Sequence, residues 1–250
     1  MAIILKSNRE IALMRKAGRD VAEILQVLKE AVKPGISTAF LNDIAEREVA
    51  KRGIIASFKG YRGFPASLCT SVNCEIVHGI PSAKRILKEG DIISLDFGVI
   101  REGYQGDGAV TVAVGQASLS ALKLITDTEG ALQAGIAAIV PDGHVGDIGA
   151  AVQQYAESRG WGVIREYTGH GIGRQMHEEP SVPNFGKAGF GPVLRSGTVI
   201  AIEPMLSAGS YGTKTLRDAW TVVTEDRSLA AHAEHTVAVT TTGVEILTKI

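Results

Sequence analysis

Acidic residues and histidines in this sequence gather beside glycines and within apolar segments. Asp96 and Asp107 lie in a stretch with the form of a β-hairpin that turns at Arg101–Gly103. A two-residue loop at 101 and 102 places the two aspartates directly opposite each other, with Cβ atoms about 5 Å apart, whereas a bulge at Gly103 shifts that register by one residue. Like charges opposed in a sheet are destabilising, so the pair favours a divalent cation held by carboxylate oxygens. The competing interpretation is two exposed aspartates near a turn.

Two histidines, His170 and His177, lie seven residues apart in a glycine-rich segment that ends at Pro180. Their surroundings match neither a GxGxxG phosphate loop nor the helical HExxH zinc motif. A lone histidine is more often structural than a ligand, but two in a strand-like, glycine-rich loop favour a functional site.

Glu203 and Glu234 both lie in apolar, strand-like segments. A charge in such a segment is costly to bury unless it is paired or bound to a metal. Either glutamate could pair with an arginine, such as Arg174 or Arg217. Taken together with the two aspartates and His170, the glutamates are better explained by one shared polar site.

Nucleophile-based chemistry finds little support in this sequence. It contains no GxSxG elbow, and the one SxxK match, Ser120 to Lys123, falls in an amphipathic helical pattern without its companion motifs. Cys69 could serve as a thiol nucleophile near His78 or His177, although a neutral cysteine that lines a pocket is the favoured role.

The elements that must position these residues alternate between helical and strand patterns. A capping box at Ser7–Glu10 opens a helix that Pro34 ends, and a second helix begins at Ser37 or Thr38 and closes at Gly53. Further helices are predicted over residues 119–139 and about 145–159. Strands are predicted over residues 92–100, 104–114, 198–206, 219–224 and 234–240.

Similar segments recur at an offset of 107 residues, which relates Pro34 to Pro141, Gly53 to Gly160 and Asp96 to Glu203. This spacing predicts an internal duplication with a pseudo-twofold axis, so that Asp96 and Glu203 occupy equivalent strands. Chance similarity between two helix-then-strand patterns is the alternative, because few positions are identical.

Composition excludes several classes of protein. The chain has 250 residues, 45% of them hydrophobic and 21% charged, which is typical of a globular protein and not of a disordered or fibrous one. Its 26 basic and 27 acidic residues give a net charge of -1, without the basic excess of a nucleic-acid-binding module. Two cysteines build neither a disulfide framework nor an all-thiolate zinc site. We expect no signal peptide and no membrane span.

An ordered set of motifs resembles the type I methionine aminopeptidases, in the short bacterial form. The motifs are Tyr61–Pro65, Cys69–Asn73, His78–Pro81, Asp96–Gly98, Asp107, Thr168–Gly173, His177–Pro180, Ile202–Met205, Trp220–Thr221 and Glu234–Thr236. The resemblance runs nearly end to end. It implies the α+β "pita-bread" fold, a pseudo-twofold antiparallel sheet with helices on its outer face. The whole chain, 1–250, is then a single metallopeptidase domain of two similar halves, about 1–107 and 108–250.

The resemblance also implies an activity and its residues. The activity is metal-dependent removal of N-terminal methionine from peptides and nascent proteins, with a preference for a small second residue. Two divalent ions (Co, Mn, Fe(II) or Zn) would activate a water for attack on the scissile carbonyl. The implied ligands are Asp96, Asp107, His170, Glu203 and Glu234, with Asp107 and Glu234 bridging. Glu203 is also the implied general base, and His78 and His177 contact the scissile amide. The implied methionine pocket comprises Tyr61, Phe64, Cys69 and Trp220, with His78 and His177 at its edge.

Two departures from the family pattern bear on the pocket. Met176 and Ala233 stand where bulkier or aromatic residues commonly precede His177 and Glu234, so a smaller wall could admit a bulkier second residue. We read the other histidines, His144, His232 and His235, as structural or solvent-exposed.

The rivals are an X-Pro aminopeptidase or prolidase of the same fold, and a non-catalytic protein that kept the fold. We further expect a cytoplasmic monomer with transient ribosome contact and no membrane or nucleic-acid partner.

Overall fold

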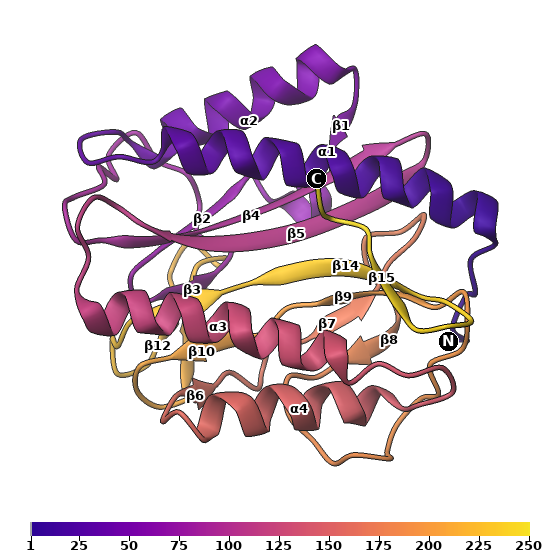
Figure 1. The fold of residues 1–250 in the computed structure, drawn as a ribbon. Coiled ribbons are helices and arrows are strands. Elements are labelled where there is room, and N and C mark those ends of the chain that lie inside the picture. Colours follow the sequence, from indigo (N-terminus) through magenta and orange to yellow (C-terminus); the bar gives the residue numbers. More distant parts are fainter. Residues whose placement is uncertain (1) are drawn as a thin grey trace.

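The computed structural model describes residues 2–250, and four α-helices give it its outer layer (Figure 1). They are α1 (Asn8–Ala31), α2 (Thr38–Arg52), α3 (Leu119–Ala137) and α4 (Val145–Glu157). The capping box at the start of α1 is confirmed, because Glu10 N–H is held by Ser7 Oγ and Ser7 N–H by Glu10 Oε2. Gly53 closes α2 in the left-handed region, at φ 63°, as predicted.

Fifteen strands and one short 3₁₀ helix, η1 (Tyr61–Gly63), complete the described part of the chain. The strands are β1 (Ile55–Ala56), β2 (Cys69–Val72), β3 (Glu75–Val77), β4 (Ile92–Arg101), β5 (Tyr104–Ala113), β6 (Gly162–Val163), β7 (Gly169–Gly171), β8 (Glu178–Val182), β9 (Val199–Ile202), β10 (Met205–Ser207), β11 (Thr213–Thr215), β12 (Val222–Thr224), β13 (Ala230–His232), β14 (Glu234–Val239) and β15 (Val244–Ile246). Within residues 2–250, no helix is long and apolar enough to cross a membrane.

A nine-stranded antiparallel sheet forms the centre of the molecule. Its main path runs β1-β4-β5-β14-β9-β7-β8, with β2 beside β4 and β15 beside β14. Two three-stranded sheets, β13-β10-β6 and β11-β12-β3, flank it. The strand β14 therefore joins a part of the sheet built early in the sequence, β4 and β5, to a part built late, β9 and β7.

Side chains along each strand point alternately to the two faces of the sheet, so core residues and site residues lie on opposite faces. In β4, the side chains of Leu95, Phe97 and Val99 pack into one cluster with residues of α1 and α2. In β9 and β14, Ile200, Ile202 and Val237 pack into a second cluster with α3 and α4. Because neighbouring residues of a strand point to opposite faces, the acids between these positions point away from the helices, toward the concave side of the curled sheet.

The β4–β5 hairpin has a different register from the one predicted. Glu102 and Gly103 occupy the turn with φ of 50° and 80°, as a two-residue turn with both central φ values positive requires. Asp96 is paired with Ala109, and Asp107 with Gly98. The predicted direct pairing of Asp96 with Asp107 is therefore wrong. The two side chains nevertheless share one face, as diagonal neighbours.

Two other strands begin or end differently from the prediction. The predicted strand 198–206 is broken, because Ile202 ends β9 in the large sheet and Met205 begins β10 in a small one. Pro204 between them has no N–H to continue a ladder. The predicted strand 219–224 begins only at Val222, because Asp218 accepts hydrogen bonds from the N–H groups of Trp220 and Thr221 in a turn.

Contacts in the two halves repeat at the offset found in the sequence. Ser37 forms an isolated bridge with Ile86, and His144 forms one with Val193. The division into halves of about 1–107 and 108–250 stays a prediction, with these bridges in its favour.

Candidate metal centre and substrate cavity

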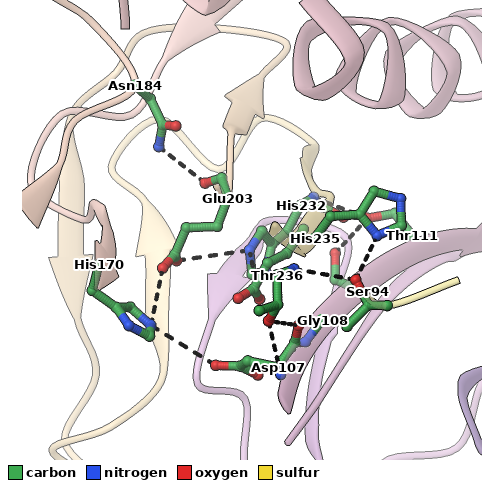
Figure 2. A network of polar contacts seen from close by, with 12 residues as sticks. Ser94, Asp107, Gly108, Thr111, His170, Asn184, Glu203, His232, His235 and Thr236 are labelled. Carbon is green, nitrogen blue, oxygen red and sulfur yellow. Dashed lines mark hydrogen bonds and ion pairs between the residues drawn. The ribbon is translucent and has the colours of Figure 1, made fainter. Parts of the chain in front are cut away.

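Five residues from four strands and one strand break surround the inner end of a cavity. Asp96 lies on β4, Asp107 on β5, His170 on β7 and Glu234 on β14, while Glu203 follows β9 directly. All five line the same cavity. The residues that the sequence grouped into one polar site are thus neighbours in space, and Figure 2 shows the contacts of His170 with Asp107 and Glu203.

His170 is oriented as a ligand would be. Its Nδ1 lies 2.9 Å from the carbonyl oxygen of Gly171, which fixes the proton on Nδ1. Its Nε2 is left with a free lone pair, 3.8 Å from Asp107 Oδ2 and 3.7 Å from Glu203 Oε1. Asp107, His170 and Glu234 each offer a ligand atom within 4.8 Å of the others. Separations of this size suit donors that share one ion.

The carboxylates at this site are short of compensating charge. Asp107 and Glu234 are 4% and 3% exposed, and Asp96 and Glu203 open only partly onto the cavity. Burial raises the pKa of Asp107 to about 7. Burial, together with the neighbouring acids, raises the pKa values of Asp96, Glu203 and Glu234 well above the usual range.

The alternative of an arginine partner finds no support. Arg174 lies over the ring of Tyr104, and the described basic side chains within 4.0 Å of the Glu203 and Glu234 carboxylates are the imidazoles of His170 and His232. Asp96 Oδ1 and Glu234 Oε1 are buried without a hydrogen-bond partner in residues 2–250. A set of four carboxylates and one imidazole with orphaned oxygens fits a divalent cation of the Mn, Fe, Co or Zn type.

Two further histidines stand at the wall of the cavity. His177 Nδ1 is 2.8 Å from the hydroxyl of Tyr61, and the two rings stack with centroids 5.4 Å apart. His78 sits in the left-handed region, at φ 59°, with its ring edge-on to Trp220. Burial lowers the pKa of His78 to about 4, so the ring is neutral near pH 7.

The other end of the cavity is apolar. Phe64 and Trp220 meet edge to face with centroids 5.1 Å apart, and Cys69 lies beside them in the same cavity lining. Burial and the charge of Asp96 raise the pKa of the Cys69 thiol, so this cysteine is a neutral wall residue and no nucleophile. The structure adds Phe58, which lies outside the sequence motifs, and Arg62, which lies within the motif Tyr61–Pro65 but was not assigned to the pocket.

The two residues that depart from the family pattern, Met176 and Ala233, lie in different parts of the structure. Met176 lines the cavity, whereas Ala233 packs in the cluster under α3 and α4. Only Met176 can therefore shape the wall directly.

Of the two roles expected for His232, structural or solvent-exposed, the structure excludes exposure. His232 is 1% exposed, and its Nε2 lies 3.8 Å from Glu203 Oε2, so it belongs to the site. The signal was present, because His232 and Glu234 are two residues apart in an extended segment and so share a face. His235, one residue further on, points elsewhere and contacts Thr248 Oγ1.

Comparisons with known proteins agree with this geometry. The model of metallopeptidase family M24 matches residues 12–241. Methionine aminopeptidase of Clostridium acetobutylicum is 53% identical over 246 residues, which are 98% of this chain and 98% of that protein. Methionine aminopeptidase 1 of Bacillus subtilis is 50% identical over 99% of this chain and 100% of its own.

A solved structure shows the same fold. The crystal structure of methionine aminopeptidase from Thermotoga maritima superposes with a TM-score of 0.98 at 41% identity, over 100% of both chains. The α+β pita-bread fold implied by the motifs is thereby confirmed. The chain belongs to metallopeptidase family M24 and, within that family, to the methionine aminopeptidases.

Proposed function

We propose that this protein removes the N-terminal methionine from peptides and nascent proteins by metal-dependent hydrolysis, with a preference for a small second residue. One observation carries the proposal: a cluster of four carboxylates and a histidine lies at one end of a cavity whose other end is aromatic and apolar. Relatives that match nearly the full chain at about 50% identity are named methionine aminopeptidases. Since they are methionine aminopeptidases, a prolidase activity is not favoured.

Asp96, Asp107, His170, Glu203 and Glu234 would together hold the two divalent ions that we assign to this site. The buried, orphaned carboxylate oxygens support this assignment. When bound, the ions supply Lewis acidity and make water nucleophilic at neutral pH. Their identity, among Co, Mn, Fe(II) and Zn, is to be settled by activity.

Proton movement falls to the side chains of the chain itself. Glu203 faces the cavity, so its carboxylate is placed to take a proton from water and to release it later. His177, with Nδ1 held by the Tyr61 hydroxyl, presents its other nitrogen to the scissile amide. His78, neutral at pH 7, can donate an N–H to the carbonyl oxygen of the substrate as negative charge develops on it.

The methionine side chain is accommodated by the apolar end of the cavity. Tyr61, Phe64, Cys69 and Trp220 form this wall together with Phe58 and Met176. Aromatic edges and a thiol suit a flexible thioether, which packs against them and makes sulfur–aromatic contacts. The polar edge of the cavity holds the amide within reach of His78 and His177. The protein is further proposed to act as a cytoplasmic monomer that contacts the ribosome transiently.

Metal depletion and readdition test the proposal. The purified protein is stripped with a chelator, assayed on Met-Ala-Ser, and assayed again after addition of Mn, Fe(II), Co or Zn. We expect activity to vanish and at least one ion to restore it. A chelated protein that keeps full activity would refute metal dependence.

A matched pair of variants tests the general base. Glu203→Gln should abolish release of methionine from a Met-Gly peptide while the fold, followed by circular dichroism, stays intact. Glu225→Gln, which alters an exposed glutamate, serves as the control and should leave release unchanged. Unchanged turnover by Glu203→Gln would remove Glu203 from the mechanism.

A further inference from the structure

His232 is held firmly by its backbone at the end of β13. Its N–H donates to Thr111 Oγ1 at 2.9 Å, and its carbonyl oxygen accepts from the same hydroxyl at 2.7 Å. That hydroxyl also lies 2.7 Å from Ser94 Oγ, so side chains of two other strands, β4 and β5, fix the position of His232 (Figure 2). A side chain anchored in this way is well placed to orient another group.

The ring of His232, by contrast, has no hydrogen-bond partner in the described part of the chain. Both nitrogens are buried and unpaired. Nε2 lies 3.8 Å from Glu203 Oε2 and 3.9 Å from Glu234 Oε2. These separations exceed a hydrogen bond, yet two carboxylates are the polar groups that the nitrogen faces. A neutral imidazole has one N–H to donate.

The position of the ring argues against a role as a direct ligand. Asp96, Asp107, His170, Glu203 and Glu234 all line the cavity, and His232 does not. The ring therefore lies behind the carboxylates, on the side away from the substrate. His170 uses its N–H on a backbone carbonyl, whereas the N–H of His232 has no such acceptor and is available to a carboxylate.

We propose that His232 is a positioning residue, whose Nε2–H donates to Oε2 of Glu203 and orients that carboxylate in the metal-loaded protein. Glu203 is the carboxylate that most needs such support, because it sits at the break between β9 and β10 outside any strand ladder. Its backbone carbonyl is held by Asn184 Nδ2 at 2.9 Å, but no hydrogen bond from residues 2–250 reaches its side chain. This inference rests on the proposed function, since it assumes that Glu203 binds a metal ion.

Metal affinity is the direct test. We compare dissociation constants for Mn and Co, measured by calorimetry on the full chain, between wild type and three variants. His232→Leu keeps the volume and removes the donor, and we expect affinity to fall about 10- to 100-fold. His232→Gln keeps an N–H at a similar reach, and we expect it to restore affinity to near the wild-type value. His235→Leu removes a half-buried imidazole that contacts Thr248 and not the site, so we expect lower stability with affinity unchanged.

A measurement on the wild-type protein covers the case in which His232→Leu fails to fold. Nitrogen NMR of histidine-labelled, Zn-loaded protein reports which ring nitrogen of His232 carries the proton. We expect Nε2 to be protonated and protected from exchange. An unprotonated Nε2, a His232→Leu variant with wild-type affinity, or a His232→Gln variant as weak as His232→Leu would each overturn the proposal. A wild-type protein that binds no metal would instead refute the proposed function.

Discussion

Asp107→Asn should stabilise the metal-free protein while destroying its response to metal. Burial raises the pKa of Asp107 from 3.8 to about 7. This rise means that keeping the carboxylate ionised in the fold costs about 4 kcal/mol at pH 8. Asparagine carries no charge, and its side-chain oxygen can still accept the Gly108 N–H that Asp107 Oδ1 accepts at 3.0 Å.

The expected net gain is smaller than the full electrostatic cost. Burying an amide that is only partly hydrogen-bonded costs about 1–2 kcal/mol, which leaves a gain of about 2 kcal/mol. For a domain of this size that gain raises the melting temperature by about 4–8 °C. The size of the gain depends on pH. A carboxyl with a raised folded-state pKa makes the protein less stable as pH rises from 3.8 to about 7, so the advantage of asparagine should be smaller at pH 5 than at pH 8.

The assay is thermal unfolding of chelated protein at pH 8 and pH 5, with and without a divalent ion. Wild type should gain about 3 kcal/mol from an ion present at a hundred times its dissociation constant, and Asp107→Asn should gain far less. Asp226→Asn is the matched control, because hydrogen bonds from Ser228 and Ser210 lower the pKa of this exposed carboxyl to about 2. It should lose a little stability instead of gaining it. Our reasoning fails if Asp107→Asn is less stable than wild type at pH 8 without metal.

Three further outcomes follow from the site. The metal-free protein should lose stability as pH rises above the ordinary carboxyl range, because the fold raises the pKa values of Asp96, Glu203 and Glu234 and so disfavours their ionisation. A urea-unfolding profile that is flat with pH would contradict this. Phe64→Ala should lower kcat/KM for Met-Ala-Ser about 10- to 100-fold, because apolar contact with the methionine side chain is lost, while metal affinity measured by calorimetry stays unchanged. Phe40→Ala, which alters an exposed phenylalanine, is the control, and an equal loss of kcat/KM in that variant would count against the prediction. Met-Val-Ser should be cleaved at least about tenfold more slowly than Met-Ala-Ser, because Ala233 packs in the core and does not enlarge the cavity for a bulkier second residue. Equal rates for the two peptides in the same assay would contradict this.

Local signals in the sequence predicted the helices well. The capping box at Ser7 and the left-handed Gly53 act within one turn, so their effect is readable from neighbouring residues alone. The grouping of acids was also predictable, because a charge such as Glu203 in an apolar segment demands a partner wherever it lies.

Properties that depend on pairing between distant segments were predicted less well. The register of the β4–β5 hairpin depends on which two residues take positive φ, and Gly103 was assigned to the wrong position in that turn. The break at Pro204 was missed because a continuous apolar segment does not reveal that its first part, β9, and its second part, β10, belong to different sheets. His232 was not assigned to the site, since its neighbours, Glu203 and Thr111, are far away in sequence.

The central place of β14 has a consequence for when activity can arise. This strand pairs with β5 on one side and β9 on the other, and it carries Glu234. A growing chain that has not yet synthesised β14 lacks Glu234 and lacks the strand that pairs with both β5 and β9. A fragment ending before β14 should therefore lack activity, so the site is complete only after the C-terminal part of the chain has been synthesised.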